Sequence, residues 1–182
     1  MIVWILGGVF VFLAVIIFVY YNRFAVLKNR IDNSLSQINV QLKRRAELIP
    51  NLIETVKGFA SHEKAAIKAV TDARKALMKA EGLSDKMKAD GALENALKSI
   101  FALAEGYPNL KANTNFLELQ KELAATEDKV AYARQYYNDS VMAYNNLYKT
   151  FPGNMFAKMF GKKSEDYLKV TEAEKKPVKV KF

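Results

Sequence analysis

The sequence predicts an all-α protein in which an N-terminal transmembrane helix continues into a bundle of long antiparallel helices. Three observations predict this fold. Residues 2–21 carry no charged side chain, apolar residues then recur at intervals of three and four, and only 4 prolines and 8 glycines occur in 182 residues. All 28 basic and 19 acidic side chains follow residue 21, so the polar part carries the whole net charge of +9.

The first 21 residues are predicted to be a retained membrane anchor. Twenty helical residues cover about 30 Å, which is the thickness of the hydrocarbon core of a bilayer. A cleavable signal peptide fits less well, because Met1 alone precedes the apolar run and no small-residue cleavage site follows it. Aromatic residues mark both ends of the run, as at lipid–water interfaces. The predicted anchor residues are Ile2, Trp4, Tyr20, Tyr21 and Arg23.

The charges beside the anchor predict its orientation. Arg23, Lys28 and Arg30 follow the apolar run, whereas the terminal amine is the only positive group before it. By the positive-inside rule, the C-terminal domain is expected in the cytoplasm. We therefore expect a single-pass protein of the inner or plasma membrane.

The rest of the chain is predicted to form a helical bundle over residues 22–153, a short amphipathic segment over 154–170 and a charged, mobile tail over 171–182. The first apolar stripe begins at Phe24 and continues to Ala80, with a kink rather than an end at Pro50. Connections are expected at residues 81–91 and 105–114, with a shorter helix, 92–104, between them. A last long helix is expected from Asn115, with Glu118 as its capping-box acid, to Pro152.

Several motifs in the bundle resemble those of the LemA family. The central signature lies at residues 42–53 (LKRRAELIPNLI) and 56–63 (VKGFASHE). Further matches are YNRF at 21–24, AEGYPNLKA at 104–112, ARQYYN at 133–138 and YN at 144–145. The resemblance implies an N-terminal membrane helix and a cytoplasmic helical bundle, and it implies no reaction. One relative in magnetotactic bacteria is tied to magnetosome membrane formation, which suggests membrane shaping for the family.

The residue types that carry catalysis or bind metals are scarce. There is no cysteine, and His62 is the single histidine. A metal site or a nucleophilic relay therefore lacks its usual groups. We expect no enzyme activity, no cofactor and no metal. Nucleic acid is not an expected partner either, because basic residues alternate with acidic ones along every helix.

Two sets of residues are candidate sites. Arg134, Asn138 and Asn145 share one edge of the last long helix, and we expect them to form a register-setting polar layer with Arg45 of the first long helix. A contact between subunits is the alternative for this set. The second set is a candidate membrane-surface contact that could equally cover the end of the bundle: Phe156, Lys158, Phe160, Lys162 and Lys163.

These expectations favour a non-enzymatic scaffold that is anchored in membrane lipid and self-associates as a homo-oligomer, with membrane organisation or remodelling as its expected role. A stiff helix leaving the bilayer would hold the bundle at a fixed height, where neighbouring copies can pack laterally. The alternative function is an adaptor or regulator of another membrane protein, such as a protease or sensor.

Overall fold

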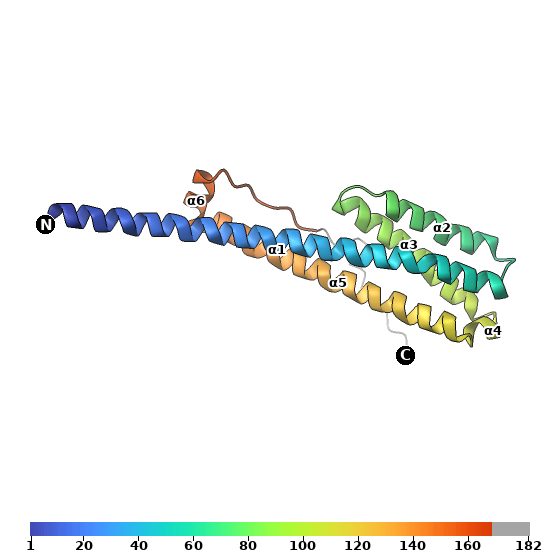
Figure 1. Ribbon diagram of the computed structural model, residues 1–182. Helices are drawn as coiled ribbons and strands as arrows, with labels where there is room; N and C mark the ends of the chain where they lie inside the picture. The colour runs from blue at the N-terminus through green and yellow to red at the C-terminus, as the bar shows by residue number, and fades with distance from the viewer. Residues whose placement is uncertain (169–182) are drawn as a thin grey trace, which may run out of the picture. The chain divides into compact units, whose positions relative to one another are not determined.

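The computed structural model describes residues 1–168, which form helices and no strand (Figure 1). The all-α prediction is therefore confirmed. The expected charged tail and the last two residues of the expected amphipathic segment lie outside the described residues. The helices are α1 (Ile2–Phe59), α2 (Lys64–Lys79), α3 (Leu83–Ala104), α4 (Pro108–Lys111), α5 (Thr114–Lys149) and α6 (Gly153–Met159).

The helices belong to two compact units. The terminal unit combines Met1–Ser34 with Gln135–Phe182, and the central unit is Leu35–Arg134. The central unit contains α2, α3 and α4 together with parts of α1 and α5. Within it, α2 and α3 lie side by side as an antiparallel pair (Figure 1).

Helix α1 is continuous from the apolar segment into both units. Its first part contains a window of 18 residues that is long and apolar enough to cross a membrane, and none of that window is buried in the protein. Beyond it, apolar residues at intervals of three, four or seven are buried, as expected for one face of a helix. These are Phe24 and Ile31 in the terminal unit and Ile38, Leu42, Ala46, Ile49, Leu52 and Val56 in the central unit.

Pro50 lies within α1, and the helix continues past it to Phe59. A proline cannot donate a hydrogen bond to the carbonyl four residues earlier, which here belongs to Ala46. Arg74 of α2 supplies the missing donor, because its Nε donates to the carbonyl oxygen of Ala46 at 2.8 Å. The proline therefore creates an acceptor that ties α2 to α1.

Two of the predicted helix boundaries in the central unit were wrong. The first stripe does not run unbroken to Ala80, because α1 ends at Phe59 and a turn separates it from α2. The expected connection at 81–91 is mostly helix, since α3 begins at Leu83 and includes Gly91. Glycine costs about 1 kcal/mol in a helix relative to alanine. Burial of the apolar side chains of Met87 and Leu93 on one face of α3 offsets that cost.

The start of the last long helix also differs from the prediction. Helix α5 begins at Thr114, and its cap is Asn113, whose Oδ1 accepts a hydrogen bond from the Phe116 amide at 3.0 Å. Glu118 is therefore not a capping-box acid. At the other end α5 stops at Lys149, before the expected end at Pro152, and Phe151 is 81% exposed. Asparagine is a strong N-cap residue, which explains the earlier start.

We predict that Arg74 and Pro50 are energetically coupled. Arg74→Met should destabilise the protein by about 1–3 kcal/mol, because it leaves the Ala46 carbonyl without a donor. In a Pro50→Ala background the same change should cost much less, since residue 50 then donates to Ala46 itself. A double-mutant cycle of thermal unfolding in detergent measures the coupling. Equal effects of Arg74→Met in both backgrounds would contradict this account.

Candidate functional site

Helix α6 packs against the end of the apolar segment in the terminal unit. The ring of Phe156 stacks on Tyr20 with a centroid distance of 4.5 Å and an interplanar angle of 18°. The ring of Phe160 meets Tyr21 and Phe24 edge to face, at 5.4 and 6.4 Å. Aromatic pairs of this kind contribute about 0.5–1.5 kcal/mol beyond the burial of their area. Helix α6 is thus fixed beside the residues at which the apolar run ends.

This packing corrects part of the predicted membrane-surface contact. Phe156 is buried and Phe160 is half-buried, so both rings contact α1 instead of projecting from α6. Lys158 and Lys163 are exposed, and the Nζ of Lys162 lies 5.7 Å from the centre of the Tyr21 ring. The large apolar side chains that do project from this region are Phe151, Met155 and Met159.

The predicted anchor residues all lie on α1. Ile2 and Trp4 are more than 70% exposed, as expected of residues that no part of the protein covers. Tyr20 and Tyr21 carry the α6 contacts. Arg23 lies with its guanidinium 5.9 Å from the centre of the Tyr20 ring, which is a cation–π distance. Aromatic and cationic side chains therefore meet at the end of the apolar segment.

A glycine turn directs the chain out of α6. Gly161 has a φ of +61°, and the amides of Gly161 and Lys162 donate to the carbonyls of Lys158 and Ala157. This is a Schellman motif, in which the left-handed residue is usually glycine because it has no Cβ. The chain then continues without helix from Lys162 to Leu168, which we call the extended segment.

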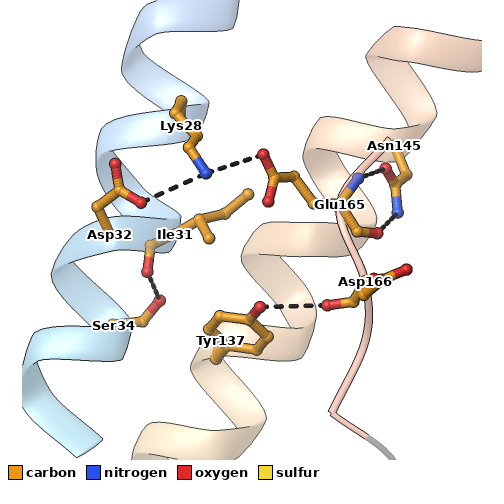
Figure 2. A network of polar contacts seen from close by, with 8 residues as sticks. All are labelled: Lys28, Ile31, Asp32, Ser34, Tyr137, Asn145, Glu165 and Asp166. Carbon is orange, nitrogen blue, oxygen red and sulfur yellow. Dashed lines mark hydrogen bonds and ion pairs between the residues drawn. The ribbon is translucent and has the colours of Figure 1, made fainter. Parts of the chain in front are cut away.

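Two asparagines of α5, Asn138 and Asn145, bind the main chain of the extended segment; we call them the asparagine pair. Asn145 donates from Nδ2 to the Glu165 carbonyl at 2.8 Å and accepts from the Glu165 amide at 3.0 Å (Figure 2). Asn138 binds Leu168 in the same two-sided way, at 3.3 and 2.9 Å. The side-chain nitrogen and the side-chain oxygen of each asparagine thus both bind the backbone of one residue of the segment.

The spacing of the asparagine pair matches that of its ligands. Seven residues along a helix advance about 10.5 Å. Three residues of extended chain advance about 10 Å. Asn138 and Asn145 are seven apart, and Glu165 and Leu168 are three apart, so the two repeats agree. The earlier asparagine, Asn138, binds the later residue of the segment, Leu168, so the segment runs antiparallel to α5.

Side chains from α1 and α5 complete the contact. The Nζ of Lys28 lies 2.8 Å from Glu165 and 3.4 Å from Asp32 (Figure 2). Burial lowers the pKa of Lys28, but the hydrogen bond and the charge of Glu165 outweigh it, so the pKa is raised overall. Tyr137 donates to the Asp166 carbonyl at 3.1 Å. Burial and the charge of Glu165 raise the pKa of Tyr137, which keeps its hydroxyl protonated as a donor.

Arg45 lies in a different network, in the central unit. Its side chain is 2% exposed, with Nη1 at 2.9 Å from Asp90 of α3 and Nη2 at 3.1 Å from Glu127 of α5. Burial raises the pKa of Asp90, even though the positive charges of Arg45 and Arg134 act to lower it. The expected single layer of Arg45, Arg134, Asn138 and Asn145 is thus divided. The two arginines act on Asp90, whereas both asparagines bind the extended segment.

His62 and its surroundings show no sign of a reactive site. His62 is exposed in the turn between α1 and α2, and neighbouring Glu63 accepts a hydrogen bond from Tyr107 at 2.8 Å. Among residues 1–168, no group of three His, Cys, Asp or Glu side chains is placed to hold a metal ion.

Sequence reasoning missed Asp90, Glu127 and the extended segment. Asp90 carried a usable signal, because it lies three residues after Met87 and three before Leu93, in phase with the buried face of α3. The aspartate–glycine pair at 90–91 indicated a turn instead. The extended segment has no periodic pattern, so the asparagine pair had no visible partner in the sequence.

Fold and site together define a class: an all-α protein with one N-terminal helix long and apolar enough to cross a membrane, and a segment bound along its last long helix. Residues 34–182 match the LemA family, and the chain belongs to that family.

Three relatives show what this chain is similar to. The magnetosome protein MamQ 2 of Paramagnetospirillum magneticum is 24% identical over 87% of this chain and 68% of its own length. MamQ of Magnetospirillum gryphiswaldense matches with the same identity and coverage. Protein LemA of Metamycoplasma hominis is 28% identical over 77% of this chain and 66% of its own length. The family is thus shared with magnetosome proteins.

We predict that breaking the buried ion pair of Arg45 and Asp90 lowers the stability of the protein strongly, whereas replacing both residues with apolar ones lowers it little. Asp90→Leu should destabilise the protein by about 3–5 kcal/mol, because Arg45 stays buried beside a lost acceptor. Arg45→Leu/Asp90→Leu should recover most of that loss. The neighbouring exposed pair, Arg44 and Glu122 at 3.6 Å, is the control, and its loss should cost at most about 1 kcal/mol. Thermal unfolding compares them; an Asp90→Leu effect as small as the control would contradict the assignment.

We also predict that Asn145 protects the extended segment. Asn145→Leu removes both hydrogen bonds to Glu165. If the bound segment loses about 1.4 kcal/mol of stability, its open state is populated about tenfold more and its amides exchange about tenfold faster. Hydrogen–deuterium exchange of the peptide containing residues 162–168 measures this rate. Asn146→Leu is the matched control, since Asn146 is adjacent and exposed. Equal exchange in the two variants would show that the asparagine does not hold the segment.

Proposed function

We propose that this protein is a membrane-anchored scaffold whose helical domain lies in the cytoplasm and associates with other copies of itself. The observation that carries the proposal is the continuity of α1. The residues that can cross a membrane and the residues that form the core belong to one helix, Ile2–Phe59. A domain built on such a helix stays at the membrane for as long as it is folded.

Helix α6 supports a fixed position at the lipid surface. Its buried aromatic ring stacks on Tyr20, at the end of the apolar segment, while Met155 and Met159 project from it. Methionine side chains at that level can enter the interface, and exposed Lys158 and Lys163 can meet anionic headgroups. The residues proposed to touch lipid are thus the projecting ones, not Phe156 and Phe160.

The charge pattern supports the cytoplasmic orientation. Arg23, Lys28 and Arg30 lie within nine residues of the end of the apolar run at Tyr21, and the part of the chain after it carries the net charge of +9. Each lysine or arginine near an anionic leaflet contributes about 1 kcal/mol of attraction. The magnetosome proteins among the relatives favour a role in membrane organisation.

We predict that crosslinking intact membranes gives a ladder of self-oligomers. The full-length chain, expressed at low level, is treated with a lysine-specific crosslinker and compared with the same membranes after dilution in excess detergent. Dimers and larger products that disappear on dilution are expected.

The same preparation can contradict the proposal. Monomers alone would rule out the scaffold, and a stoichiometric foreign protein in the product would favour the adaptor. His62→Cys tests orientation, because the chain has no cysteine and residue 62 is exposed. A membrane-impermeant maleimide should label this variant only after the cells are opened.

A further inference from the structure

The bonds between the asparagine pair and the extended segment are made to main-chain atoms. Asn138 and Asn145 use both their donor and acceptor atoms on the backbone of Leu168 and Glu165, and Tyr137 donates to a third backbone carbonyl. Extended peptides added to a sheet edge are bound in the same way, through alternating amides and carbonyls. Such a site does not depend on which chain supplies the backbone.

One side chain of the segment is also recognised. Glu165 pairs with Lys28 of α1, as Figure 2 shows between the two helices. The site therefore favours an extended segment that carries an acidic residue at the position bound by Asn145. Ser164–Leu168 of this protein (SEDYL) has that residue.

We propose that the asparagine pair is a binding site for an extended acidic peptide segment and that its ligand in the assembly is Ser164–Leu168 of a second copy. The exchanged segment would make the same contacts that it makes within its own chain. This inference rests on the proposed function, because it names the contact through which copies associate.

The connection to α6 is suited to such an exchange. The turn at Gly161 sets the direction of the segment, and Lys163 and Ser164 are exposed. Exchange of an identical element is a common route to dimers, since the contacts are already present in the monomer. Membrane anchors add to this, because they hold neighbouring segments and sites at the same height and raise their effective concentration.

The experiment uses two differently tagged full-length copies in the same membrane, since the chain has no cysteine of its own. One copy carries Asp32→Cys and the other carries Ser164→Cys, so that Lys28, Glu165 and the asparagine pair stay intact, and a short bifunctional maleimide is added. A crosslinked dimer with both tags is expected, because exchange brings these two positions together. Adding Asn145→Leu to the Asp32→Cys copy should reduce this product about tenfold, whereas Asn146→Leu should leave it unchanged.

The outcomes separate this inference from the proposed function. A third variant carries both cysteines in one chain. If this variant crosslinks only within itself and the mixture of single-cysteine copies gives no dimer, exchange is overturned. If the lysine-crosslinked ladder nevertheless persists in those membranes, the scaffold stands and uses another surface. If the ladder is also absent, both proposals fail.

Discussion

The structure depends on one constraint, which is that the single helix α1 carries two different kinds of surface without interruption. Its first part is apolar on every face and uncovered, whereas its later part buries a narrow stripe that begins at Phe24. A helix can meet both demands because all of its backbone hydrogen bonds are internal. The change from one surface to the other falls at Tyr20–Arg23, where α6 packs. The position of α6 and of the segment that follows it depends on that transition.

Several polar groups within the packed regions are paired by a partner from elsewhere in the fold. Pro50 exposes a carbonyl that Arg74 satisfies, and buried Arg45 is held by acidic side chains of α3 and α5. Burial raises the pKa of Asp90 even though the positive charge of Arg45 acts to lower it. Breaking such a buried pair costs more than the pair contributes to stability. The asparagine pair applies the same principle to a segment without secondary structure, because its backbone groups need partners too.

The sequence predicted the helices well where the apolar pattern repeated over many turns. It failed where a local turn signal opposed that pattern. The stripes of α1 and α5 were visible over many turns, so tertiary packing had little to change. Asp90 and Gly91 indicated a turn, yet they are helical because Met87 before them and Leu93 after them are buried on the same face of α3. Arg45 and Asn145 could be placed near a packed edge from their spacing alone. Their partners could not, because Asp90 lay in an expected loop and Glu165 in a segment with no period.

The proposed membrane attachment, the proposed lipid contact of α6 and the proposed exchange between copies all require that α1 leaves the bilayer as an unbroken helix. The most direct test is a scan of single spin-labelled cysteines through residues 10–30 in liposomes, comparing accessibility to oxygen with accessibility to a water-soluble relaxation agent. The account predicts a change from lipid to water near Tyr21, with a period of about 3.6 residues in the accessibility from residue 22 onward. Water-accessible labels throughout residues 10–18, or loss of the helical period between residues 22 and 30, would contradict it.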